Sequence, residues 1–191
     1  MHTLKVLALL AAAAIACPAA TLKMLSLDQM ADESQTVVHG RVLASRAEWN
    51  STHTSIVTVY TVKADRYLKG DLGATFELTE LGGQVGNLAM QAAGAPHFKA
   101  GEEVVLFVWT DGVERRHQAI GFEQGVFRVR TEATGAKFVN RNVPVARTGE
   151  FVPTEVAGQR LEPSRELSGF LAQVSATISR VAQERRTGVR R

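Results

Sequence analysis

The sequence predicts an all-β protein: a small, partly closed antiparallel barrel with a short N-terminal helix and a C-terminal amphipathic helix. About seven short segments rich in β-branched residues are separated by glycine-bearing turns. These predicted strands are unequal in length and some contain glycine, which favours a curled sheet over a flat sandwich. Helical periodicity occurs only toward the two ends of the mature chain, where a helix can cover one end of a barrel.

Residues 1–20 have the layout of a secretory signal peptide. A basic start is followed by an apolar run, Val6–Ala16, that is too short to span a bilayer, and then by small residues suited to cleavage. We therefore expect an exported protein, periplasmic or secreted. The stretch ending at Cys17 also resembles a bacterial lipobox, with Ala14 where leucine is usual. Lipidation of Cys17 is the alternative, and it would anchor the protein to a membrane.

The mature chain suits one core without disulfides, because Cys17 is the only cysteine. We expect a barrel domain at residues 21–160 and a helix with a basic tail at residues 161–191. Five arginines and one glutamate lie in Arg180–Arg191, so this tail carries a net charge of +4 and the remaining mature chain −2. The tail is either a solvated end or a contact for an anionic membrane surface. Its candidate contact residues are Arg185, Arg186, Arg190 and Arg191.

The N-terminal half predicts a helix and then a long hairpin. Ser26 can cap a short helix within Thr21–Ser34, with Asp28 in its first turn. Two strands follow at Thr36–Ser45 and Ser55–Leu68, with a bend or bulge at Gly40 in the first. Trp49–His53 forms a polar connection between them.

The middle of the chain alternates between strands and turns. Thr75–Leu81 is a strand that places Phe76, Leu78 and Glu80 on one face. Residues 82–96 are expected to be irregular. Val104–Trp109 is a continuous apolar run and predicts a strand buried on both faces. Shorter strands are expected at the ranges His117–Gly121, Gly125–Thr131 and Lys137–Asn140.

An amphipathic helix is predicted near the C-terminus, beginning with Ser164 as its cap and ending at Thr187-Gly188. An apolar stripe on one face should dock it on its own domain, the alternatives being a partner or a membrane surface. The stripe consists of Leu167, Leu171, Val174, Ile178 and Val181.

Sequence motifs for catalysis and cofactor binding are almost absent. The five histidines lack the spacing of metal ligands, and His39, on a strand, is interpreted as a structural residue. The glycines at 82, 83 and 86 form a turn rather than a phosphate loop. Strand carboxylates allow an enzyme as a minor alternative; they are Glu77, Glu80, Glu102 and Glu103. We expect no cofactor, no metal and no nucleic-acid binding.

The segments Ala31–Val42, Tyr67–Gly70 and Pro96–Phe107 resemble the opening and a later strand of netrin-like domains, the group that includes tissue inhibitors of metalloproteinases. The resemblance implies an OB-type barrel. The same segments also resemble small exported bacterial proteins of unassigned function. It does not carry over an inhibitory Cys-x-Cys terminus, because this chain has no cysteine besides Cys17.

We therefore expect an exported, non-enzymatic binding module that contacts another envelope or secreted protein, for which a protease is one candidate. The alternative is an envelope-anchored structural or lipid-contacting protein. Glycine- and alanine-rich loops over a compact barrel are where such contacts commonly lie. The candidate contact residues outside the tail are Trp49, His53, Gly82, Gly83 and Gly86.

Overall fold

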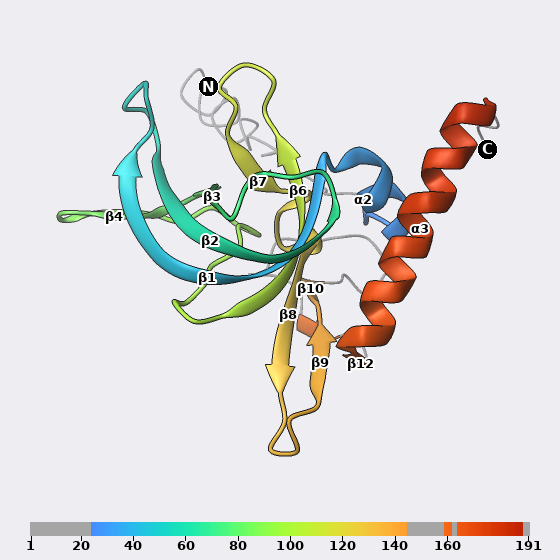
Figure 1. The fold of residues 1–191 in the computed structure, drawn as a ribbon. Coiled ribbons are helices and arrows are strands. Elements are labelled where there is room, and N and C mark those ends of the chain that lie inside the picture. Colours follow the sequence, from blue (N-terminus) through green and yellow to red (C-terminus); the bar gives the residue numbers. More distant parts are fainter. Residues whose placement is uncertain (1–23, 145–158, 162–163, 189–191) are drawn as a thin grey trace, which may run out of the picture.

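The structure, a computed structural model, describes residues 24–144, 159–161 and 164–188. Cys17, Arg190 and Arg191 and the whole predicted signal peptide lie outside these residues. Within these residues the chain forms a mostly β structure with one large antiparallel sheet and two α-helices (Figure 1). The sheet order is β12-β9-β8-β6-β1-β2-β3, with β7 also paired to β6.

Apart from the last strand, at Arg165–Glu166, where a helix was expected, the elements of this sheet lie close to the predicted ranges. Its strands are β1 (Thr36–Trp49), β2 (Ile56–Lys69), β3 (Thr75–Leu81), β6 (Glu103–Thr110), β7 (His117–Ala119), β8 (Val126–Thr131), β9 (Lys137–Asn140) and β12 (Arg165–Glu166). Two further pairs are the hairpin β4 (Gly83–Val85) and β5 (Leu88–Met90), and β10 (Asn142–Pro144) with β11 (Gln159–Leu161). The short 3₁₀ helix η1 (Phe122–Gly125) was not expected from the sequence.

The first helix, α2 (Leu27–Glu33), confirms the predicted cap. The hydroxyl of Ser26 accepts a hydrogen bond from the amide of Gln29, and the Gln29 side chain accepts one from the amide of Ser26. This reciprocal capping box satisfies two of the amide groups that a helix N-terminus leaves unpaired. The helix buries Met30 and Ala31 against the sheet.

The predicted hairpin is confirmed, because β1 and β2 pair antiparallel along their length. The register between them shifts at His39/Gly40. A Cβ atom at Gly40 would lie 2.3 Å from the carbonyl oxygen of Lys63, so only glycine allows the two backbones to approach this closely. β1 runs further than expected and includes Trp49, which was assigned to the connection.

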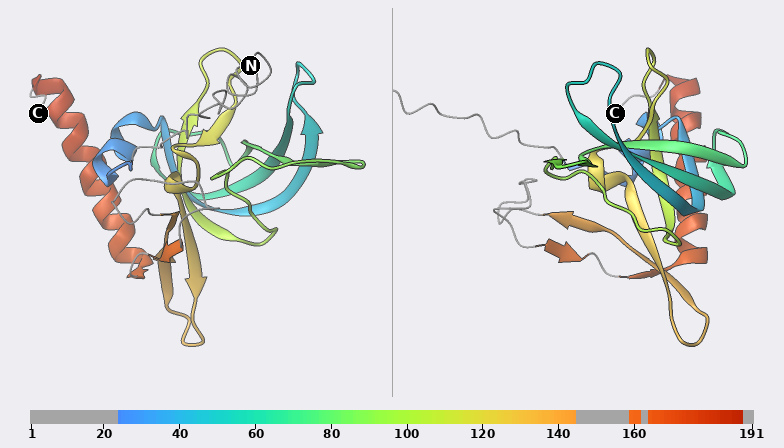
Figure 2. Two further views of the ribbon diagram at one scale, coloured as in Figure 1. Left: turned by 180° about the vertical axis from the view of Figure 1, so that it is seen from behind. Right: turned by 90° about the vertical axis from the view of Figure 1, so that its left-hand side faces the viewer.

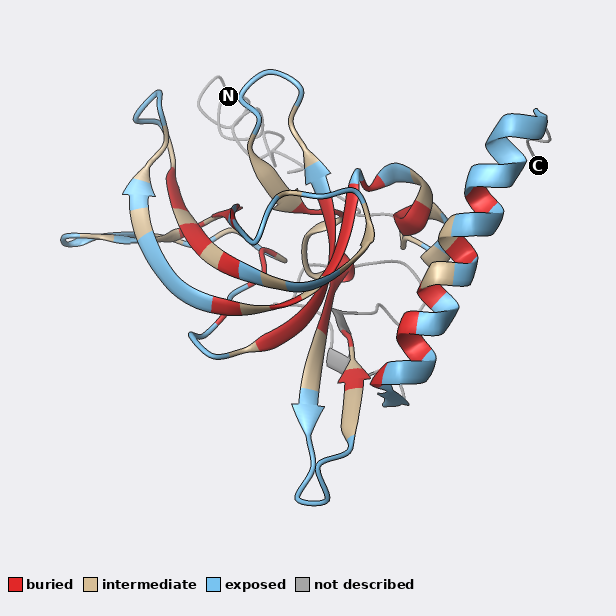
Figure 3. Ribbon diagram, in the orientation of Figure 1, coloured by how far each residue is buried: buried red, intermediate tan, exposed pale blue. Residues whose placement is uncertain are grey.

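Strand β6 lies at the centre of the molecule and is buried on both faces, as predicted (Figure 3). Val105 and Phe107 pack in a cluster with the two helices, whereas Val104, Leu106 and Val108 pack in a second cluster enclosed by β1, β2 and β3. The prediction was wrong for Trp109, which is 39% exposed because the strand passes beyond both clusters there.

The C-terminal helix α3 (Leu167–Thr187) docks on its own sheet, as expected (Figure 2). Phe170 packs on Phe127 with 4.6 Å between ring centroids. The predicted cap at Ser164 was wrong: Glu166 is the cap residue, and together with Arg165 it forms β12. Gly188 ends the helix in the left-handed conformation, at the predicted position.

The sheet curls but does not close. β3 and β7 lie side by side, yet no backbone ladder joins them in the described part of the chain. Residues 82–96, expected to be irregular, contain the hairpin β4–β5, which projects from the body (Figure 1). Its turn begins at Gly86, with φ +59°. Glycine is favoured there because two-residue hairpin turns need a positive φ.

Candidate binding cleft

A cleft of about 340 Å³ opens where the sheet fails to close. We call it the seam cleft. Its lining comes from β3, from β7 and the segment after it, from the exposed end of β6 and from the end of α2. The lining residues are Glu33, Glu80, Leu81, Trp109, Gln118, Ala119, Ile120, Gly121 and Phe122. A largely apolar lining with a few polar groups is typical of ligand-binding sites.

Glu80 is the side chain that bridges the seam. Its carboxyl Oε1 accepts a hydrogen bond of 2.7 Å from the backbone amide of Ala119 on β7. The carboxyl therefore replaces the main-chain acceptor that a closed ladder would supply to β7. Glu80 is only 3% exposed. The alternation predicted for β3 had placed it beside Phe76 and Leu78, and all three are buried.

Burial dominates the electrostatics of Glu80 and raises the pKa of its carboxyl to about 8. The hydrogen bond from Ala119 opposes this rise, and the negative charge of Glu123 adds to it. At neutral pH the carboxyl is therefore mostly protonated. Perturbed carboxyls in clefts are common at functional sites.

The other strand carboxylates do not gather at this site. Glu77 forms an ion pair with Arg46 on the outer surface, with 2.7 Å between the nearest oxygen and nitrogen. Glu102 pairs with Arg128, which also contacts Glu123.

Glu103 is buried and lies against three cationic or polar nitrogens. It accepts hydrogen bonds from Lys137, Arg41 and His39 at 2.8 to 2.9 Å. Burial alone would raise the pKa of Glu103, but the bonds from Lys137 and His39 outweigh it and lower the pKa. His39 thus has the structural role expected of it.

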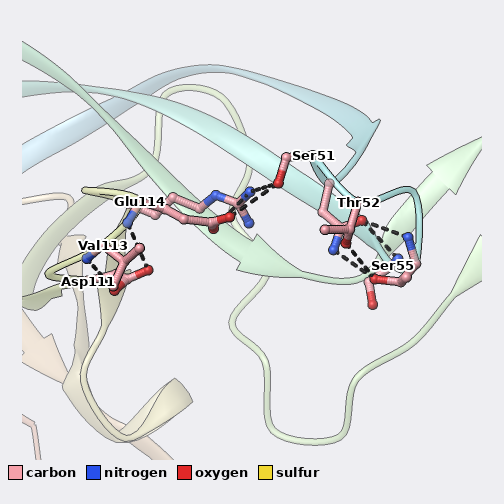
Figure 4. A network of polar contacts seen from close by, with 9 residues as sticks. Ser51, Thr52, Ser55, Asp111, Val113 and Glu114 are labelled. Atoms are coloured by element: carbon pink, nitrogen blue, oxygen red, sulfur yellow. Dashed lines mark hydrogen bonds and ion pairs between the residues drawn. The ribbon is translucent and has the colours of Figure 1, made fainter.

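The Trp49–His53 connection is ordered by its own contacts. The two rings stack with 6.3 Å between centroids, and the side chain of Asn50 accepts hydrogen bonds from the amides of Thr54 and Ser55. Ser51 donates to Glu114 and accepts from Arg116, which joins this tip to the β6–β7 loop (Figure 4). This contact between the two loops was not predicted from the sequence.

Two of the candidate contact glycines, Gly82 and Gly83, pack against residues of their own chain. Gly83 is partly buried, and a Cβ atom there would lie 2.6 Å from the Thr58 hydroxyl. The carbonyl of Gly82 accepts a hydrogen bond from the same hydroxyl. Gly86 lies at the tip of the β4–β5 hairpin with open space around it, next to Leu88, which is 59% exposed.

The described part of the basic tail contacts α2. Arg185 forms an ion pair with Asp32, and Arg180 lies 2.5 Å from a carboxylate oxygen of Asp28. Arg186 is exposed and makes no ion pair with a described residue. Two of the five arginines assigned to the basic tail are therefore paired with acidic residues of α2.

Comparison with protein-family models, with curated protein sequences and with solved structures found no match to this chain. Across the described residues, no helix combines the length and apolar content needed to cross a membrane. Within the same ranges, no three histidine, cysteine or acidic side chains gather in a way that would hold a metal ion. The seam cleft is the candidate site because it combines a partly apolar lining with the buried carboxyl of Glu80.

Proposed function

We propose that this chain is an exported, non-enzymatic binding module, and that the seam cleft receives a segment of another envelope or secreted protein. In this proposal β1, β2, β3, β6 and β7 make up an OB-like, partly closed barrel whose opening is the binding site. The observation that carries the proposal is the cleft itself: about 340 Å³, mostly apolar, with Trp109 exposed in its lining. Exposed aromatic side chains beside apolar clefts are frequent anchors of protein interfaces.

Two loops extend the surface available to a partner. Val113 on the β6–β7 loop is 90% exposed, and Leu88 projects from the β4–β5 hairpin. The hydrogen bonds from Ser51 and Arg116 hold the β6–β7 loop against the β1–β2 tip. A loop already fixed by such contacts loses less conformational freedom when a partner binds.

The test is site-specific crosslinking in an exporting bacterial host. A photoreactive residue replaces Gln118, which lines the cleft, and in a matched control replaces Thr134, which lies in the exposed β8–β9 turn. We expect one protein, identified by mass spectrometry, to be captured from position 118 and not from position 134. Equal capture from both positions would contradict the proposal.

Two other outcomes would replace the proposal. Recovery of lipid and membrane components alone, lost in a Cys17→Ser variant, would favour the envelope-anchored alternative. Turnover of a substrate that is lost in Glu80→Gln or Glu33→Gln would favour an enzyme, since a buried carboxyl with a raised pKa has the property of a general acid.

A further inference from the structure

Glu80 differs from the buried Glu103 and the half-buried Glu123 in having no positive neighbour. Glu103 and Glu123 each pair with at least one cationic side chain. Among the described residues, Glu80 makes a single hydrogen bond, from Ala119, and its second oxygen, Oε2, has no partner. The lining of the seam cleft contains no lysine, arginine or histidine. A buried carboxyl in an apolar site is costly to ionise unless a cation accompanies it.

We propose that the seam cleft binds the ammonium group of a lysine side chain from the partner protein, with Glu80 as its counter-ion. This inference rests on the proposed function, because the partner supplies the lysine. Glu33, at the end of α2, contributes a second negative charge to the same cleft. Arg128, which contacts the neighbouring Glu123, is engaged with Glu102 and Glu123.

The geometry favours lysine over arginine. A guanidinium binds a carboxylate best through two parallel hydrogen bonds, which need both oxygens. Here Oε1 is already used by the amide of Ala119, so one oxygen is left. An ammonium is a compact charge that needs only one. Its four-carbon stem can lie along the apolar side chains of the cleft, which include Leu81, Ile120 and Phe122.

Binding of the lysine requires loss of one proton from Glu80. At pH 7 the reaction is a neutral carboxyl plus an alkylammonium giving an ion pair and a released proton. Burial is the largest cause of the pKa of about 8 at Glu80; the hydrogen bond from Ala119 opposes it and the charge of Glu123 adds to it. Burial is likewise the largest cause of the raised pKa of Tyr60 on β2, to which the charge of Glu80 adds a smaller part. Glu33 faces the cleft from α2. Because every one of these neighbours is acidic or neutral, none of them supplies the missing positive charge.

The affinity should consequently depend on pH in a defined way. Below about pH 8 the association constant should rise about tenfold for each pH unit, because one proton is released per lysine bound. It should level off above pH 8. It should fall again near pH 10, where the free lysine loses its own charge.

The experiment uses Nα-acetyl-lysine methylamide as the probe and the mature protein carrying Trp49→Phe, so that Trp109 is the only indole. Fluorescence titration gives the affinity from pH 6 to 9. Calorimetry in two buffers of different ionisation enthalpy gives the number of protons released. We expect about 0.9 proton released at pH 7 and almost none at pH 9. If no proton were released at pH 7, this result alone would overturn the proposal, and no variant would be needed.

Matched variants separate charge from shape. Glu80→Gln keeps an acceptor for the amide of Ala119 but removes the charge, so binding should weaken at least tenfold and proton release should disappear. Glu77→Gln, on the same strand but exposed and paired with Arg46, should bind like the parent protein. Unchanged binding by Glu80→Gln would overturn the proposal.

Related probes identify the source of the ammonium. The arginine analogue should bind at least tenfold more weakly, and the Nε-acetylated lysine analogue should not bind. If free n-butylamine bound tenfold more tightly than the lysine probe, this result would contradict a protein lysine as the ligand. A partner captured at position 118 with no binding of the lysine probe would overturn this inference alone. Probe binding with no captured partner would overturn the proposed function, and with it the partner as the source of lysine.

Discussion

Replacing Glu80 with glutamine should remove the pH dependence that this one carboxyl gives to stability. In the folded protein burial raises its pKa to about 8, whereas in the unfolded chain it titrates near 4.5. Between these two pH values the folded state holds a proton that the unfolded state has lost. The free energy of unfolding therefore decreases as the pH rises through this window. Glutamine binds no proton in either state, so the variant lacks this contribution.

The size of the effect follows from the two pKa values. Each pH unit inside the window changes the unfolding free energy by about 1.4 kcal/mol. With allowance for the curvature at both ends, the stability of Glu80→Gln relative to the wild type should increase by about 3–4 kcal/mol between pH 5 and pH 8. Side-chain packing changes little, because glutamine and glutamic acid have nearly the same shape.

Urea unfolding followed by tryptophan fluorescence at pH 5, 6, 7 and 8 measures this difference. Subtracting the variant from the wild type removes the contributions of all other titrating groups. Glu77→Gln is the control: its hydrogen bond with Arg46 lowers the pKa of Glu77, so its contribution has the opposite sign. A difference between Glu80→Gln and wild type that is the same at pH 5 and pH 8 would refute the assignment of Glu80 as a buried, unpaired acid.

Four further substitutions test the fold, each by urea unfolding. Gly40→Ala should lower the free energy of unfolding by about 2 kcal/mol or more, since its Cβ would meet the Lys63 carbonyl. Gly169→Ala, which has open space around it in α3, should raise the free energy of unfolding by about 0.5–1 kcal/mol. Equal effects of the two substitutions would contradict the close approach at Gly40. Ser26→Ala should lose about 1 kcal/mol with the capping box, and no loss would mean that the cap is dispensable. Phe170→Ala should lose about 3–5 kcal/mol, and a loss below 1 kcal/mol would show that α3 does not depend on this core contact.

Local chemistry was enough to predict most of the elements. The alternation of Thr75–Leu81 gave the strand β3 with its bounds and placed Glu80 on its apolar face. The continuous apolar run around Phe107 predicted a strand buried on both faces, since each face packs in its own cluster. The cap at Ser26 and the stop at Gly188 were equally readable from neighbouring residues, whereas the reciprocal bond from Gln29 was not predicted.

Predictions that depended on where a segment ends in space were less accurate. Trp109 continues an apolar run but emerges from the core, and Trp49 belongs to a strand rather than to the connection. Arg180 and Arg185 appeared as part of a free basic tail, yet they pair with Asp28 and Asp32 more than 150 positions earlier.

The sequence by itself determined the segments, their periodicity and the two helices, because capping, turn chemistry and side-chain alternation act over a few residues. Only the tertiary structure decided that β3 and β7 meet without a ladder and that the Glu80 carboxyl bridges them. The same holds for the charge state of Glu80, because its pKa depends on burial among residues distant in the sequence. Desolvation and cation pairing are properties of assembled neighbours, and the order of residues along one strand does not contain them.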